Sequence, residues 1–202
     1  MNRTKLLLFL MVLPLWAQGQ ETRSWIGLSA TRTTTDAMQW ADLVGGPASS
    51  ASHGYRIGLQ YQRIVRPKFA LEGGLYLTQA QYQLVSLPFP GVQETVATVE
   101  PRTYRLVSLL VRPKYYVNTH QVRFYVVGGA SVDVQNYALV NEDNNSGVGA
   151  QLGAGLEGSL GSRLIVSVES SIRTLSLIRF VKEQYPWRVV TAGVQLGFHY
   201  GL

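Results

Sequence analysis

The feature of this sequence that most constrains its fold is a two-residue alternation of apolar with small or polar side chains, which recurs along most of the chain. It is clearest at the C-terminal end. There the even positions from Val190 to Leu202 are apolar, whereas the odd positions from Val189 are mainly Gly, Thr, Gln and His. Because successive side chains of a strand point to opposite faces, such a segment has one apolar and one polar face. No long stretch shows the periodicity of an amphipathic helix, so we expect an all-β fold.

The alternation defines an even number of candidate strands. They are the segments 25–33, 54–64, 69–78, 104–117, 122–135, 148–160, 163–173 and 189–202. Short and long connections alternate between them. The short ones are Arg66-Pro67-Lys68, Asn118-Thr119-His120 and Gly161-Ser162, and the long ones are roughly 34–53, 85–102, 136–147 and 176–187. In outer-membrane barrels the short turns face the periplasm and the long loops face outside, so this order predicts both termini in the periplasm.

The composition of the polar face indicates which side of the sheet meets the solvent. A soluble lipocalin-like barrel would also have eight strands, but its outer face should be rich in Lys, Glu and Thr. Here that face carries mainly Gly, Ser and Gln, and charged residues make up 15% of the chain, against about 25% for an ordinary soluble domain. Side chains just fill the interior of an eight-stranded barrel. We therefore predict an eight-stranded antiparallel up-and-down transmembrane β-barrel, with the lipocalin-like barrel as the alternative.

Charged residues of the polar parity are expected to form a network inside the lumen. They are Arg56, Glu72, Arg112, Lys114, Arg123, Asp133, Glu157, Glu169 and Arg173. Positive and negative charges are nearly balanced among them, and buried charges are tolerated when they are paired and hydrogen-bonded.

Aromatic residues of the outward parity lie toward the predicted strand ends. They are Tyr55, Phe69, Tyr115, Phe124 and Tyr200. This placement predicts aromatic girdles at the two membrane interfaces, although packing in a protein core would also bury aromatic residues.

The N-terminal segment 1–19 has the pattern of a secretory signal peptide. Arg3 and Lys5 precede an apolar run, and Ala17-Gln18-Gly19 supplies the small residues of a cleavage site. The run is about half the length of a membrane-spanning helix, which makes a membrane anchor the weaker alternative. We therefore expect an exported barrel domain over residues 20–202. The chain has no cysteine, which excludes disulfides, cysteine-type zinc sites and a lipoprotein anchor.

Several strand phrases resemble those of known outer-membrane barrels. Among them are YRIGLQYQRIV, FALEGGLYLT, LVSLLVRPKYYV and VGAQLGAGLEGSL. Over residues 24–202 the chain resembles the PorT-like barrels of Bacteroidota and, more loosely, the OmpX/OmpA barrels. The resemblance implies a bacterial outer-membrane location, insertion by the barrel assembly machinery and, as one alternative, an accessory role in protein secretion. The end of the chain looks like an assembly signal made by Gln195, Gly197, Tyr200 and Leu202, although Phe is commoner than Leu at the last position.

The sequence offers few candidates for catalysis or metal binding. His53, His120 and His199 are not at metal-ligand spacings, so we predict no metal site and no cofactor. A lipid-modifying enzyme would need a serine beside a histidine. Ser108 and Ser170 are candidate outward-facing serines, but neither has a histidine across from it. We therefore expect a protein without enzymatic activity.

The long loops are the expected places of interaction. The segments 85–102 and 176–187 combine apolar and basic residues, which suggests contact with lipopolysaccharide phosphates or with a protein partner. Protruding strands that pack on one another would produce the same pattern. Basic residues are scattered over the strands, so we expect no nucleic-acid binding. The function predicted is structural, or depends on the extracellular loops.

Overall fold

The computed structural model describes seven stretches of the chain. They are residues 24–39, 48–50, 52–86, 98–135, 146–161, 163–180 and 187–202. The predicted signal peptide, 1–19, lies outside these residues, as do 40–47, 87–97, 136–145 and 181–186. The described stretches contain no helix that is long and apolar enough to cross a membrane.

All regular structure in the described residues is β-strand. The strands are β1 (Ser24–Gln39), β2 (Ala48–Ser50), β3 (Ser52–Arg66), β4 (Phe69–Ser86), β5 (Thr98–Tyr116), β6 (Val122–Gln135), β7 (Gly147–Leu160), β8 (Leu164–Arg179) and β9 (Trp187–Gly201). The short β2 pairs with β4 beyond the part of β4 that pairs with β3, so β2 and β3 together occupy one strand position of the sheet. The barrel therefore has eight strand positions, as predicted.

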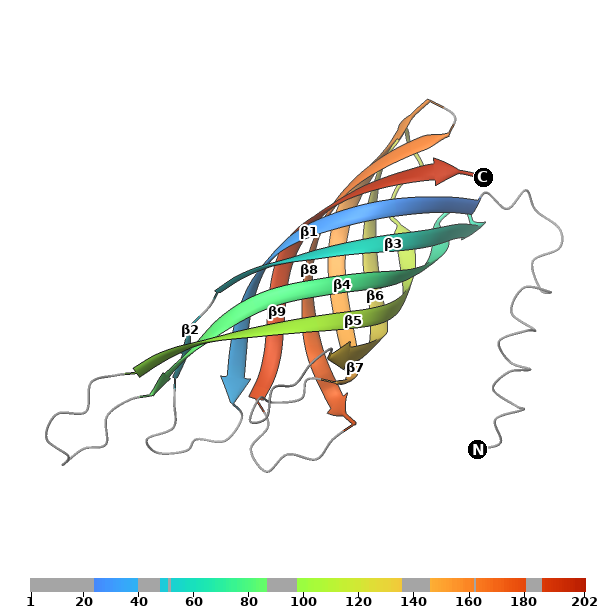
Figure 1. Cartoon of the computed structure of the whole chain (residues 1–202). Coiled ribbons are helices and arrows are strands. Elements are labelled where there is room, and N and C mark those ends of the chain that lie inside the picture. Colours follow the sequence, from blue (N-terminus) through green and yellow to red (C-terminus); the bar gives the residue numbers. More distant parts are fainter. Residues whose placement is uncertain are drawn as a thin grey trace, which may run out of the picture.

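The sheet closes on itself, with each strand antiparallel to its neighbours (Figure 1). Strands that follow one another in the sequence pair with one another, and β1 pairs with β9 from Trp25 opposite Gly201 to Gln39 opposite Trp187. Closure satisfies the backbone hydrogen bonds that an open edge would leave unpaired, which is the condition for a sheet to cross a bilayer. The predicted up-and-down barrel is thus confirmed.

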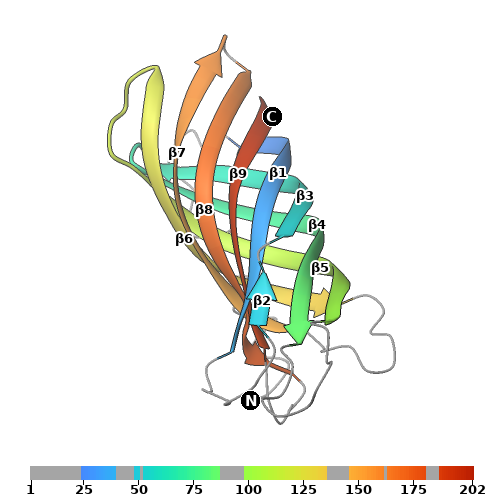
Figure 2. The ribbon, with the colours of Figure 1, turned by 90° about the vertical axis from the view of Figure 1, so that its left-hand side faces the viewer.

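The two ends of the barrel differ in their connections. At one end, called here the turn end, short turns join β3 to β4, β5 to β6 and β7 to β8, and β1 begins where β9 ends. The amide of Leu202 donates to the carbonyl of Ser24 over 2.9 Å, which ties the last residue to the first strand. At the opposite end, called the loop end, β4 and β5 project beyond the other strands (Figure 1), and Figure 2 shows the barrel from the side of this projection.

The strands at the loop end are longer than the apolar pattern predicted. β1 continues to Gln39 instead of ending near residue 33, β4 continues to Ser86, and β8 continues to Arg179. The predicted loops 34–53, 85–102 and 176–187 were therefore too long, and β7 already begins at Gly147. Only the part of a strand that faces the hydrocarbon of a membrane needs apolar outward side chains, so the apolar alternation ends with that part. The backbone hydrogen bonds between neighbouring strands do not depend on lipid and continue beyond it.

The apolar rows face outward and the polar rows face inward. Leu28, Leu152 and Ile172 are 65%, 72% and 60% exposed, whereas Gln60, Glu72 and Glu157 are at most 1% exposed. A water-soluble barrel would expose its polar face and enclose its apolar one. The lipocalin-like alternative is therefore wrong for this chain, because the exposed belt is the apolar one.

Candidate functional site

All nine charged residues of the predicted network line the lumen. Eight of them are buried, and the side chain of Arg123 is 15% exposed. They come from six strands, β3 to β8, and each occupies an inward position of its strand. Each of the four lumen carboxylates has at least one cationic partner.

Arg112 is the centre of this network. Its guanidinium contacts Glu72 on the neighbouring β4 at 2.6 Å and Glu169 on β8 at 2.5 Å. β5 and β8 are three strand positions apart in the barrel, so Arg112 bridges the lumen as well as pairing with a residue on a neighbouring strand. Glu169 also accepts hydrogen bonds from Tyr125 at 3.1 Å and from Gln151 at 3.2 Å. The Nε atom of Arg112 donates to the same Glu72 oxygen at 2.7 Å, and hydrogen bonds between two charged groups are stronger than those between neutral ones.

A second cluster lies toward the turn end, around Glu157. The ammonium of Lys114 lies 3.3 Å from Glu157 and 3.0 Å from Glu72, which connects this cluster to the central one. Arg123 forms an ion pair with Glu157, and the hydroxyl of Tyr116 donates to the same carboxylate at 3.1 Å. Glu157 thus has two cationic partners and one neutral donor.

A third cluster lies toward the loop end. Arg173 forms an ion pair with Asp133 and donates to Ser108 at 2.9 Å and to Ser131 at 3.1 Å. Ser108 is fully buried. Ser108 is therefore not the outward serine that it was predicted to be, because its even number gives it the inward parity of Arg112 and Lys114. Ser170 does face outward, opposite Val194 and Ala154.

Arg56 has no carboxylate partner among the described residues. It donates to the amide oxygens of Gln151 and Gln195, each at 3.1 Å, and lies 4.9 Å from the centre of the Tyr76 ring. The excess of one positive charge in the lumen is thus held by amide dipoles and a π-face.

Sequence reasoning missed the neutral members of the network. Gln60 donates to Tyr76 at 2.6 Å and to Glu72 at 3.1 Å, and Gln62 accepts from Lys114 at 2.8 Å. These residues share the inward parity of the charged ones, so the same alternation was the signal that could have found them. Tyr76, the partner of Gln60, lies directly over Gly58, where an added Cβ would come within 2.3 Å of the ring.

The three histidines all lie in the described residues, and there they do not form a catalytic or metal-binding arrangement. His199 is buried, and neither of its ring nitrogens has a hydrogen-bond partner. The described residues give no hydrogen bond between a histidine and a serine, and no group of three side chains placed to hold a metal ion. The geometry required to activate a serine nucleophile is thus not seen in this part of the chain.

The aromatic girdle is uneven. Phe69, Tyr115, Phe124 and Tyr200 all lie outward near the turn end, where Tyr200 accepts a hydrogen bond from Arg163 at 3.3 Å. Of the five residues predicted for the girdles, Tyr55 alone lies toward the loop end.

Three residues of the predicted assembly signal lie on the two faces of β9, and the fourth, Leu202, directly follows the strand. Gln195 is buried and Gly197 faces the lumen beside Ser167. Tyr200 and Leu202 face outward and are 49% and 79% exposed. The end of the chain therefore exposes one aromatic and one apolar side chain on the outer surface of the barrel at the turn end.

Comparison with known proteins gives one family and several similar structures. The model of the outer membrane protein beta-barrel domain family matches residues 5–200. A search of curated proteins finds no significant match.

Three solved structures illustrate the structural similarity. OprG of Pseudomonas aeruginosa has a TM-score of 0.54 at 12% identity, covering 92% of this chain and 98% of that one. The Neisserial surface protein A has a TM-score of 0.50 at 11% identity, covering 85% and 95%. The outer membrane enzyme PagL has a TM-score of 0.46 at 14% identity, covering 83% and 97%. At these identities the similarity concerns the fold alone.

Proposed function

Because this chain belongs to the outer membrane protein beta-barrel domain family, we propose that it is a non-enzymatic barrel with a side-chain-filled lumen, which acts structurally or through its extracellular loops. Membership of the family implies a location in the bacterial outer membrane. The loop end then faces outside and the turn end faces the periplasm, following the usual arrangement of long loops and short turns.

The observation that carries this proposal is the bridge made by Arg112. Its ion pair with Glu169 crosses the lumen between β5 and β8, and its ion pair with Glu72 holds it to the neighbouring β4. Lys114 continues the barrier toward Glu157. A solute would have to break several buried ion pairs to pass. Since an eight-stranded barrel leaves no open channel even without such pairs, the lumen is better suited to stiffening the wall than to transport.

We predict that the folded protein forms no discrete ion channels in planar lipid bilayers. The measurement is single-channel current at neutral pH, with an open porin inserted in the same bilayer as the control for detection. Reproducible current steps from the folded wild-type protein would contradict the proposal of a plugged lumen.

Insertion by the barrel assembly machinery is the second part of the proposal. The outward Tyr200 and Leu202 supply the aromatic and apolar features of the predicted signal, although Leu202 departs from the commoner Phe. We expect the double variant Tyr200→Ala, Leu202→Ala to reach the outer membrane in a folded form several-fold less often than the wild type.

The measurement for this prediction is the heat-modifiable fraction of protein in isolated outer membranes. The matched control is Val122→Ala with Val134→Ala, two outward apolar residues on β6 that are 56% and 52% exposed. An equal loss in the control would mean that exposed apolar area in general, and not the C-terminal segment, sets the yield.

A role in secretion and a protein partner at the loops stay predictions. Ile178 and Phe180 support a contact at the loop end, because they are 64% and 58% exposed at the end of β8 and just beyond it.

A further inference from the structure

We propose that the outer face of β1, β3, β4 and β5 carries a binding site for a phosphorylated glycolipid of the outer leaflet. Its phosphate would lie between Arg32 and Arg105, and one acyl chain would lie in an apolar groove above Ala30. The site lies outside the lumen, so it goes beyond the proposed function and does not depend on whether the barrel conducts ions.

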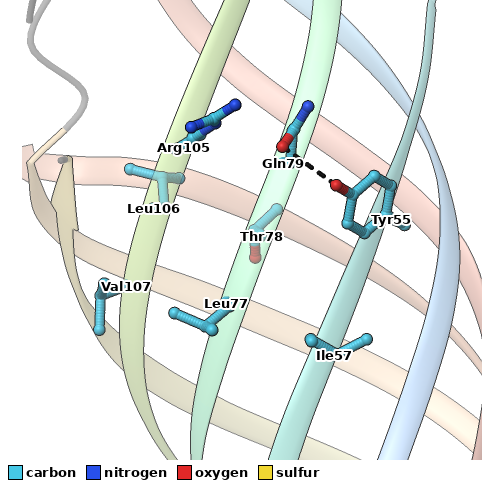
Figure 3. A pocket seen from close by; sticks show the side chains of 8 residues that line it. All are labelled: Tyr55, Ile57, Leu77, Thr78, Gln79, Arg105, Leu106 and Val107. Carbon is cyan, nitrogen blue, oxygen red and sulfur yellow. Dashed lines mark hydrogen bonds between the residues drawn. The ribbon is translucent and has the colours of Figure 1, made fainter. Parts of the chain in front are cut away.

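A row of four polar side chains runs across these strands at one register level. Arg32 is opposite Tyr55, Tyr55 is opposite Gln79, and Gln79 is opposite Arg105. Neighbouring strands are about 4.8 Å apart, so the backbones of the two arginines are about 14 Å apart and their long side chains can approach one ligand from both sides. Figure 3 shows the part of this row on β3, β4 and β5, where the Tyr55 hydroxyl donates to Gln79 at 3.0 Å.

The next row toward the turn end is entirely apolar. Ala30 is opposite Ile57, Ile57 is opposite Leu77, and Leu77 is opposite Val107. The polar row therefore marks the edge of the apolar belt at the loop end. In the membrane this edge faces outward, where the headgroups of the outer leaflet begin.

The small side chain of Ala30 leaves a groove in the apolar belt. The groove has a volume of about 580 Å³, and among the residues that line it are Leu28, Ala30, Ile57, Leu59 and Phe198. A second hollow of about 400 Å³ lies beside it toward the loop end, and Ile57 and Leu77 line both. Its lining includes Tyr55, Gln79 and Arg105 (Figure 3). The two neighbouring hollows thus differ in lining, the first apolar and the second with Arg105 at its edge, which matches a lipid tail followed by an anionic headgroup.

Charge complementarity identifies the occupant as an anion. Arg32 and Arg105 are exposed, and neither has an ion-pair partner in the part of the chain that the structure describes. The carboxylates whose side chains are described, Glu72, Asp133, Glu157 and Glu169, are all buried in the lumen. Arginine binds phosphate through two parallel charge-assisted hydrogen bonds. In the outer leaflet of the bacterial outer membrane, the phosphate-bearing lipid is lipopolysaccharide.

The test is native mass spectrometry of the folded protein in detergent micelles, titrated with diphosphorylated lipid A and with the same lipid after removal of its phosphates. We expect the wild type to bind the phosphorylated form at least about tenfold more tightly, as charge-assisted hydrogen bonds to phosphate imply. The double variant Arg32→Gln, Arg105→Gln should lose this preference. The variant Ala30→Leu, which fills the groove, should bind both lipids more weakly.

The matched control is Arg66→Gln with Lys68→Gln, which removes the same charge from exposed positions at the turn end. It should bind like the wild type. All variants are first checked for heat-modifiable migration, so that a folding defect is recognised separately. Equal binding of the two lipids by the wild type, or an equal loss in the control variant, would overturn the proposal.

Discussion

Replacing Arg112 by Met is expected to destabilise the folded barrel by about 3–5 kcal/mol, because it leaves a buried carboxylate without its cation. Among the described residues, Glu72 keeps Lys114 as a partner, whereas the only ion pair of Glu169 is the one with Arg112. Most of the loss should therefore come from Glu169. The measurement is equilibrium unfolding by urea in detergent micelles, followed by tryptophan fluorescence and by the heat-modifiable band.

A second substitution distinguishes loss of charge pairing from loss of packing. Adding Glu169→Gln to Arg112→Met removes the unpaired charge. Tyr125 and Gln151 donate to different oxygens of Glu169, so the amide oxygen can still accept from Gln151 while the amide NH2 donates to the Tyr125 hydroxyl. We expect the double variant to recover at least half of the lost stability, since removing both partners of a buried pair costs far less than removing one. The control is Arg66→Met, at an exposed turn position. A double variant less stable than Arg112→Met would refute this account of the network.

The second large effect is expected at Gly129, where Gly129→Val should cost about 3 kcal/mol, the upper part of the usual range for overpacking. The ladder between β5 and β6 is interrupted there: Val111 is opposite Ala130, and the next pair is Lys114 with Val127. Pro113 lies in this gap and has no N–H to donate. An added Cβ at Gly129 would lie 2.5 Å from both the Val111 carbonyl oxygen and the Arg112 Cβ. Because the first of these is backbone, it cannot move aside cheaply.

The matched control for this prediction is Gly158→Val on β7. A Cβ at Gly158 meets nothing within 4 Å, and a β-branched residue suits a strand that faces lipid. We expect its unfolding midpoint to equal or slightly exceed that of the wild type, when both variants are unfolded by urea in the same detergent. Similar losses in the two variants would mean that close approach at Gly129 is not the cause.

Alternation predicted the barrel because the side-chain period of a strand is independent of its partners. The even and odd rows of β9 alone reveal a two-faced strand, and the alternation of short turns with long connections predicted the up-and-down order. The first inference uses neighbouring residues alone, and the second uses only the lengths of the segments between the strands. That is why the closed antiparallel fold could be predicted from local pattern, whereas the strand ends at the loop end could not.

The lumen contacts and the outer lipid site required the three-dimensional structure. Parity assigns Arg112 and Glu169 to the same interior, but no local pattern states that two residues 57 positions apart meet across it. Similarly, Arg32 and Arg105 look like unrelated charges until the register places them in one row.

The amino-acid sequence by itself determined which face of each strand meets lipid and which meets the lumen, since burial follows the two-residue period. Tertiary structure alone decided which side chains pair, because pairing depends on the register between neighbouring strands and on the curvature that brings β5 toward β8. Those two quantities arise only when the sheet closes.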